Sequence, residues 1–559
     1  MTKIKTKNSF WAEFTPKSWT YFKGKYTLPL FKSDLLAGVT VGIVALPLAM
    51  AFAIAAGLPP EKGLITAIVA GFLISLLGGS RLQIGGPTGA FVVIIYDIVV
   101  RSGYDGLIVV TLLAGIILLI AAFSRLGALI KYIPYPLITG FTTGIAVIIF
   151  SSQIKDFFGL KIGDLPANFL QKWEALFSAF GTFDLITASL SSGTLLLIIL
   201  IRRFYPKLPW GIISVVFATL ISWGLNLPVD TIASRFGEMQ RTIPLPTFHG
   251  FSLSLANLRA LIPDALVIAF LAGIESLLSA VVADGMAGTR HKSNCELMAQ
   301  GVANIGSVLF GGIPATGAIA RTVANIKTGA KTPIAGMIHS ITILIIILAF
   351  APIVSKIPLA SLSAVLIMVA WNMSEMGHFR HLFTAPFGDI AVLLTTFLLT
   401  VLIDLTVAVE VGMILAVFLF MKRMGDTSKM ISVTSLIEEE SQSEEIIQEI
   451  PPNTEIYEIT GPFFFGVADS LKGILSHLES PPKVFILLMR NVPIIDASGM
   501  HALREFHYKC NREGTILLLS GVKETLIKSL KKFGVVDLIG KEKIFSHIDQ
   551  ALKFASKLN

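Results

Sequence analysis

The chain has few cysteines and few charged residues, and both shortages exclude large classes of proteins. Of 559 residues only two are cysteine, Cys295 and Cys510, which excludes a disulfide framework, a CxxC metal site and a covalently attached haem. Charged residues make up 15% of the chain, whereas soluble domains carry about 25%. Because 53% of the residues are hydrophobic, the composition indicates a polytopic membrane protein.

Apolar segments occupy residues 34–423, which we interpret as a transmembrane domain behind a polar, basic N-terminal segment, 1–33, that has no cleavable signal peptide. A spanning helix needs roughly 20 apolar residues, and fourteen segments qualify as candidates, although the third and tenth are short. Their cores are 34–56, 61–78, 87–100, 106–123, 134–152, 185–201, 209–226, 262–282, 295–310, 314–327, 334–352, 358–371, 388–403 and 407–421.

Basic residues predict the orientation of these spans. Most loops that follow even-numbered spans carry arginine or lysine, on the same side as the basic N-terminus. Cytoplasmic loops of membrane proteins carry an excess of lysine and arginine. The pattern therefore predicts a multi-pass protein of the plasma (inner) membrane with both termini cytoplasmic. The net charge of +8 is spread over short loops between apolar runs, so we expect no nucleic-acid partner.

The composition changes after Arg423, where the long apolar runs end. Residues 424–451 are rich in glutamate and are predicted to be an acidic linker. Residues 452–559 alternate strand-like and helical patterns, which indicates a small cytoplasmic α/β domain. We expect strands at 455–459, 484–489 and 515–519, and helices at 467–478, 499–512 and 522–533.

An internal repeat indicates where a ligand binds. The run 85–90 reads Gly-Gly-Pro-Thr-Gly-Ala, and 311–318 reads Gly-Gly-Ile-Pro-Ala-Thr-Gly-Ala, which places Gly89 and Gly317 228 positions apart. Each run precedes one of the short spans, and each repeat would hold seven spans. An odd number of spans per repeat makes the second copy inverted, and paired interrupted segments of this kind indicate a transporter's binding site.

Two half-helices that begin at these runs would direct their backbone N–H groups and positive dipole ends at one point. Such an arrangement binds an anion without a dedicated charge. A packing kink in a helix bundle is the alternative for either run taken alone, and the pairing favours a site. The predicted substrate-binding residues are Thr88, Gly89, Ala90, Thr316, Gly317 and Ala318.

Two charged residues lie where lipid or protein interior is expected. Glu275 is in the middle of a span with Ser279 one turn further on, and Arg321 is one turn into the tenth span. Charges inside a membrane are costly and mark a pathway or a paired partner. We favour Glu275 with Ser279 as a coupling site for a proton or cation, and Arg321 as a positive charge at the substrate site. The alternatives are a structural hydrogen bond for Glu275 and an ion pair between Glu275 and Arg321.

The motifs as a set resemble a known family. Residues 310–331, the run 283–297 and the early Ala-Leu-Pro-Leu-Ala at 45–49 resemble the sulfate permease (SulP, or solute-carrier-26) family of anion transporters. The C-terminal part resembles its STAS domain. No set of catalytic residues can be placed, so we expect a transporter and not an enzyme.

The resemblance implies fourteen segments in a seven-plus-seven inverted repeat, divided into a core (spans 1–4 and 8–11) and a gate (spans 5–7 and 12–14), commonly in a homodimer. It places the anion at the six residues of the paired runs. In the STAS domain, Ser498 occupies the position that is phosphorylated in anti-sigma-factor antagonists, which implies a cytoplasmic regulator; the alternative is that Ser498 only caps a helix.

One departure bears on coupling. Sodium-driven bicarbonate members have an aspartate at position 275 and a threonine at 319, where this chain has Glu275 and Ile319. We therefore expect proton coupling in preference to sodium, and no cofactor. The predicted function is secondary active transport of a small anion, with sulfate first, then bicarbonate or a dicarboxylate. A passive anion channel and a nucleobase transporter on the same fold are the alternatives.

Overall fold

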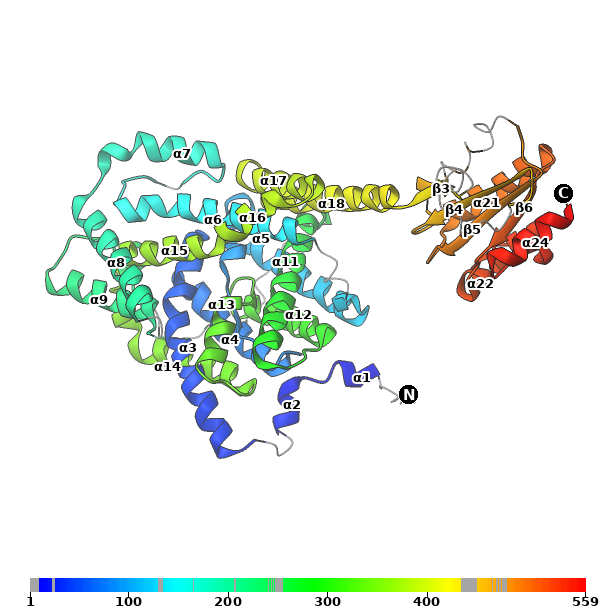
Figure 1. Cartoon of the computed structure of the whole chain (residues 1–559). Helices are drawn as coiled ribbons and strands as arrows, with labels where there is room; N and C mark the ends of the chain where they lie inside the picture. Colours follow the sequence, from blue (N-terminus) through cyan, green and yellow to red (C-terminus); the bar gives the residue numbers. More distant parts are fainter. Residues whose placement is uncertain are drawn as a thin grey trace. The chain divides into compact units, whose positions relative to one another are not determined.

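The computed structural model describes residues 10–22, 26–128, 134–163, 165–205, 208–239, 241–242, 244, 246, 255–433, 450–464, 466–468, 471, 474 and 480–558. The chain divides into two compact units, Met1–Ala416 and Val417–Asn559 (Figure 1). Three predicted features lie wholly or mostly outside the described residues: the lysines before residue 10, the glutamates at 438–449, and the helix at 467–478.

The first unit is helical, and each of the fourteen expected apolar cores overlaps a helix. The main helices are α3 (Leu28–Ala55), α4 (Pro60–Leu77), α5 (Val92–Phe123), α6 (Tyr135–Phe158), α8 (Leu185–Phe204), α9 (Trp210–Gly224), α11 (Leu255–Ala287), α12 (Ser293–Leu309), α13 (Ile319–Lys327), α14 (Ile334–Val354), α15 (Leu359–Met373), α17 (Phe387–Leu402) and α18 (Leu405–Thr427). In the described part of the chain, nine helices are long and apolar enough to cross a membrane.

The third and fourth expected spans are two helical segments, both included in α5, that meet at a kink at Gly103. That residue has φ 68° and ψ −178°, a conformation that only glycine adopts readily. The chain therefore bends between the two spans without a separate loop. Short helices that the apolar pattern did not predict are α1 (Phe10–Glu13), α2 (Lys17–Phe22), α7 (Phe169–Ser178), α10 (Ile232–Phe236) and α16 (Met376–His381).

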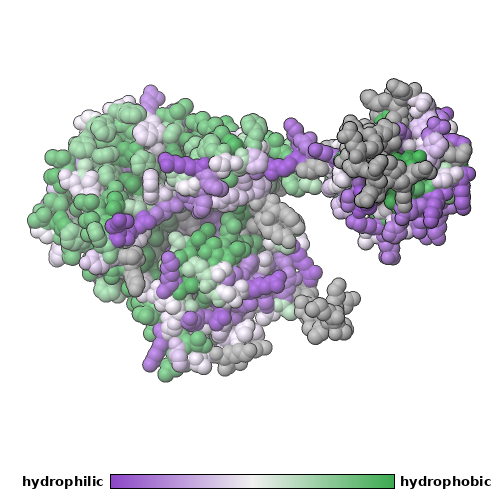
Figure 2. Space-filling view, viewed as in Figure 1, coloured by the Kyte–Doolittle hydropathy of each residue, from purple (hydrophilic) through white to green (hydrophobic). Residues whose placement is uncertain are grey.

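The long helices pack in two groups. In the first group α5 packs against α11 and α12, and α3 and α4 pack against α14; in the second, α6 packs against α15 and α17, and α8 packs against α9 and α15. The groups correspond to the core and gate that the family resemblance implies. Large apolar side chains are exposed on α8 and α9, and the surface there is mainly hydrophobic (Figure 2), as expected for helices that face lipid.

The second unit contains a five-stranded sheet of order β3-β4-β5-β6-β7 in which only β3 is antiparallel to its neighbour. Apolar side chains cover both faces and form two buried clusters. The elements are β3 (Lys429–Ser432), β4 (Thr454–Thr460), β5 (Val484–Asn491), α21 (Ala497–Arg512), β6 (Ile516–Ser520), α22 (Glu524–Lys532), α23 (Val535–Ile539), β7 (Ile544–Phe545) and α24 (Ile548–Leu558).

The three expected strands are β4, β5 and β6. β3 falls inside residues 424–451, which the glutamate content predicted to be linker, so part of that segment contributes an edge strand to the sheet. The edge pairing depends on a partner strand more than twenty positions away, and no local charge pattern could have indicated it.

Candidate anion-binding site

The two Gly/Pro runs meet in the first unit as a two-stranded antiparallel sheet. β1 (Gly85–Gly86) pairs with β2 (Thr316–Gly317), with Gly85 opposite Gly317 and Gly86 opposite Thr316. One strand leads to the short helix η1 (Gly89–Phe91), which continues as α5, and the other leads to α13. The two half-helix starts predicted from the repeat therefore lie on either side of one strand pair.

Hydrogen bonds beside the strands fix their register. The N–H of Ala318 donates to the carbonyl oxygen of Ile84 at 2.8 Å, and the N–H of Ile84 donates to the hydroxyl of Thr322 at 3.0 Å. The hydroxyls of Thr322 and Ser279 are also 3.0 Å apart. These contacts tie α13 and α11 to the first repeat.

The two membrane charges bind the segment that joins β1 to η1. Thr88 donates its hydroxyl proton to the carboxylate of Glu275 over 2.9 Å. Arg321 donates from Nη2 to the carbonyl oxygen of Pro87. Among the described residues no ion pair joins Glu275 and Arg321, so the direct pair considered as an alternative is not formed.

Arg321 is buried, with 4% of its surface exposed, and its position depends on a glycine. A Cβ atom on Gly86 would lie 2.6 Å from Nη1 of Arg321, and Gly86 has a φ of +146°, so no other residue fits there without strain. Within the described part of the chain, Nη1 of Arg321 is buried without a hydrogen-bond partner. A positive donor is thus held next to the strand pair with one nitrogen unused.

The predicted residues of the second run are engaged mainly in hydrogen bonds and packing within the protein. Thr316 donates its hydroxyl proton to the carbonyl oxygen of Ala272 at 2.7 Å, and the N–H of Ala318 is already bonded to Ile84. Gly317 is fully packed, since a Cβ there would run into the side-chain amide of Gln83. Direct contact of these three residues with an anion stays a prediction.

The unpaired backbone donors lie at the first residues of the two helices, as they do at any helix start. In the described residues, the N–H groups of Gly89 and Ala90 in η1, and of Ile319 and Ala320 in α13, have no acceptor. Ile319 and Ala320 are also exposed. The donors available on the second side therefore lie one and two residues beyond the run predicted from the repeat.

The start of η1 lies where the two packing groups meet. A Cβ atom on Gly89 would lie 3.3 Å from the ring of Phe52 on α3 and 2.7 Å from the sulfur of Met373 on α15. The start of η1 is therefore contacted by one residue from each packing group, Phe52 from the first and Met373 from the second. Neither residue carries a sequence motif, and for this reason the sequence did not indicate them.

A buried polar network fixes the segment that precedes β1. Gln83 donates from Nε2 to the hydroxyl of Ser276 at 2.8 Å, and Ser276 donates to Glu296 at 3.1 Å. The other carboxylate oxygen of Glu296 accepts from the N–H groups of Gly79 and Ser80. Sequence reasoning missed these residues, although a glutamate near the start of the ninth span was a possible signal.

Comparison with known proteins identifies the families that both parts of the chain resemble. A family model described as the sulfate permease family matches residues 31–396, and one described as the STAS domain matches residues 445–551. YvdB of Bacillus subtilis, provisionally named a sulfate transporter, is 41% identical over 532 residues, which cover 95% of this chain and 98% of that protein. The bicarbonate transporter BicA of a Picosynechococcus species is 30% identical over 456 residues, 79% of this chain and 80% of that protein.

Solved structures show the same fold. The transmembrane domain of a cyanobacterial BicA superposes with a TM-score of 0.63 at 30% identity and covers 69% of this chain and 98% of that chain. The murine Solute Carrier 26 family member A9 anion transporter, in its inward-facing state, gives a TM-score of 0.87 at 18% identity, covering 100% and 96% of the two chains. The relatives are named as transporters and not as enzymes, and the matched segments span both units of this chain. The chain belongs to the sulfate permease family and carries a C-terminal STAS domain.

Proposed function

We propose that this protein is a secondary active transporter that carries a small anion across the plasma membrane, driven by protons. Sulfate is the first candidate, followed by bicarbonate or a dicarboxylate. The observation that carries the proposal is the β1–β2 pair, which holds two helix starts together with Glu275 and Arg321 bound to the segment between them.

The anion would be held by groups that the fold leaves unsatisfied. These are the free N–H groups at the starts of η1 and α13 and the unused Nη1 of Arg321. Helix N-termini bind anions through their N–H groups and dipoles. Because such donors recognise negative charge more than shape, this set is compatible with each of the three candidate anions.

Proton coupling would act through Glu275. As a carboxylate it accepts the hydroxyl proton of Thr88, the residue before η1. A protonated carboxyl carries its own O–H and no negative charge, so the repulsion between Glu275 and a nearby anion would disappear. Ile319, at the start of α13, has no side-chain oxygen to offer a sodium ion, which supports protons over sodium.

Alternating access would come from movement of the first packing group against the second. The start of η1 touches Phe52 of one group and Met373 of the other, so relative sliding would open and close the site. Assembly as a homodimer, the cytoplasmic position of both termini and the plasma membrane as location belong to this proposal, with support from the family resemblance and the loop charges.

We further propose that a cytoplasmic regulator acts on the STAS domain at Ser498. Asp496, and not Ser498, is the N-cap of α21, because its side chain accepts from the N–H of Gly499 at 2.8 Å. Ser498 is exposed in the first turn. A phosphate there would lie at a helix N-terminus, where negative charge is favourable.

Uptake of labelled sulfate, bicarbonate and a dicarboxylate into proteoliposomes, under imposed pH or sodium gradients, tests the main proposal. We expect accumulation that follows the pH gradient and ignores sodium, and loss of accumulation in Glu275→Gln. Glu410→Gln, which removes an exposed carboxylate of α18, is the matched control and should behave as wild type. Accumulation that follows sodium at fixed pH would contradict proton coupling.

The same assay separates the two alternatives. A passive channel would equilibrate the anion without concentrating it against its gradient. A nucleobase transporter would take up uracil or adenine, and excess sulfate would not compete.

A further inference from the structure

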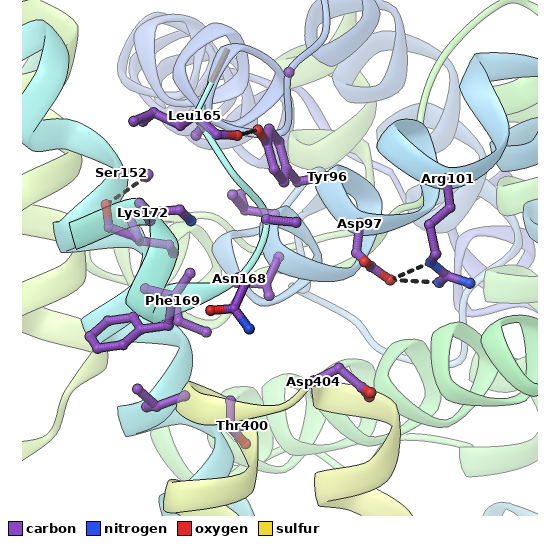
Figure 3. Close-up of a pocket in the computed structure, with 18 of the residues that line it drawn as sticks. Tyr96, Asp97, Arg101, Ser152, Leu165, Asn168, Phe169, Lys172, Thr400 and Asp404 are labelled. Carbon is purple, nitrogen blue, oxygen red and sulfur yellow. Dashed lines mark hydrogen bonds and ion pairs between the residues drawn. The ribbon is translucent and has the colours of Figure 1, made fainter. Parts of the chain in front are cut away.

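A cavity of about 820 Å³ lies in the first unit, next to the proposed anion site but distinct from it. It is lined by the end of α3, the first turns of α5, the ends of α6 and α17, and helix α7 (Figure 3). Val92 and Val93, which line it, directly follow η1 in the sequence. The cavity therefore reaches to about one helical turn from the start of η1.

The cavity opens at the end of α3 far from the N-terminal helices. Ile54 and Ala55 at the end of α3, and Gly57 just after it, line the cavity. The segment before α3 contacts the opposite end of the bundle, where the N–H of Lys17 bonds to the carbonyl oxygen of Gly78. With the N-terminus cytoplasmic, as the loop charges predict, the cavity would lie toward the outer face of the membrane and could serve as the external entrance to the site.

Most charged side chains around this cavity already have partners. Arg101 contacts Asp97 and also Asp264, at 3.2 Å, and Arg235 contacts Asp156 at 2.8 Å. Such pairs leave little net attraction for a further ion. Lys172 on α7 differs from these residues, because its ammonium group forms no ion pair with any described residue.

Lys172 is placed in the cavity wall, and among the described residues its ammonium group has no hydrogen-bond or ion-pair partner. Its side chain is buried, with 3% of the residue exposed, and no described carboxylate or carbonyl accepts from its ammonium group. Its nearest favourable contact is the ring of Tyr96, whose centroid is 5.6 Å away. Burial lowers the pKa of Lys172 to about 8, because the charged form loses water.

The way α7 packs explains why this lysine faces inward. Leu170 and Phe177 are exposed, while Lys172 and Leu176, one turn apart, are buried. Trp173 donates from its indole to the hydroxyl of Ser151 on α6 at 3.2 Å, which fastens the helix. The lysine is thus held at the wall by the packing of its own helix.

Asn168 adds a second donor beside it. Its side-chain oxygen caps α7 by accepting from the N–H groups of Leu170 and Gln171. The amide nitrogen is therefore available on the same side of the cavity as Lys172 (Figure 3). An ammonium and an amide N–H₂ together suit a small oxyanion, which accepts several hydrogen bonds.

We propose that Lys172, assisted by Asn168, forms an entry subsite that binds the oxyanion before it reaches the helix starts of η1 and α13. A buried unpaired charge is costly, and an anion in the cavity removes that cost at each cycle. The proposal rests on the anion transport proposed above and adds a residue outside the motifs on which the family resemblance rests.

Concentration-dependent uptake of labelled sulfate tests the subsite, measured at pH 7 in whole cells and in inverted vesicles from the same cells. Lys172→Met should raise the KM on one face only, by roughly tenfold or more, since a charge-assisted hydrogen bond is lost, and leave the maximal rate within about twofold. Lys172→Arg should restore the KM, because the charge returns. Lys161→Met removes an exposed charge from the same loop and should have no effect.

The outcomes separate this proposal from the function on which it rests. If the wild-type protein takes up none of the candidate anions, the proposed function fails. If it transports and Lys172→Met leaves the KM unchanged on both faces, or raises it equally on both, the entry subsite is wrong. Loss of folded protein in Lys172→Met would show by size-exclusion chromatography, and failure of Lys172→Arg to transport with a near-normal KM would then overturn the proposal.

Discussion

Alanine substitutions at Gly317 and Gly89 should separate packing from transport. A Cβ on Gly317 would run into the Gln83 amide and lie 3.0 Å from the Cα of Ser276, which is helix backbone and cannot yield. A Cβ on Gly89 would meet mainly the sulfur of Met373 at 2.7 Å, the movable part of a flexible side chain. We therefore expect Gly317→Ala to destabilise the domain and Gly89→Ala to impair transport.

The magnitude follows from these contacts. Overpacking costs about 1–3 kcal/mol, and displacing Gln83 also breaks its 2.8 Å hydrogen bond to Ser276, worth about 1 kcal/mol. Gly317→Ala should thus lower the free energy of unfolding by about 2–4 kcal/mol. For Gly89→Ala about 1 kcal/mol or less is expected, because Met373 can adopt another rotamer.

Thermal unfolding of purified protein in detergent, together with uptake, measures both effects. Gly193→Ala is the matched control, since nothing lies within 4 Å of a Cβ there, and it should be neutral in both assays. Wild-type stability in Gly317→Ala would refute the packing described around β2. Unchanged uptake in a stable Gly89→Ala protein would refute the position of the anion at η1.

Three further outcomes concern the second unit. Ser498→Glu should change the maximal uptake rate and not the KM, because the residue is exposed in a unit separate from the site; an altered KM would contradict this. The free energy of unfolding should be about 1–3 kcal/mol higher for the fragment 428–559 than for 452–559, since the longer fragment keeps the β3–β4 pairing and the partly buried Met430; equal midpoints of urea unfolding would show that β3 adds nothing. Burial lowers the pKa of His507, so the folded fragment binds fewer protons than the unfolded chain, and its stability should fall as pH drops below about 6.5. Chemical unfolding at pH 5 and 8 would measure this slope, and His507→Gln should reduce it.

The sequence predicted the helical spans well because the length of an apolar run is a local property. It also predicted two separate spans at 87–100 and 106–123, and the non-helical Gly103 divides α5 between them. The pairing of the two Gly/Pro runs could be inferred from the repeat, which is also a sequence property.

Features that depend on contacts between distant segments could not be predicted. Two examples are the hydrogen bonds from Thr316 to Ala272 and from Arg321 to Pro87. Both depend on tertiary packing, and no local sequence pattern indicates either bond. The tight packing of Gly317 against Gln83 and Ser276 likewise depends on tertiary contacts. The burial of Lys172 had only a weak signal in the sequence: it lies four residues before Leu176, on the same face of the helix, and both are buried.

The strand pair also has a consequence for biogenesis. β1 and β2 are separated by about 230 residues, so at about 5–20 residues per second β1 waits roughly 12 to 46 s for its partner to be synthesised. If the strand pair lies within the bilayer, as the interrupted spans predict, the backbone groups of Gly85 and Gly86 lack their final acceptors during that interval, and unpaired backbone groups are costly in lipid. The nascent first half must therefore keep water, the translocon or an insertion factor around this segment until the ribosome has passed Gly317.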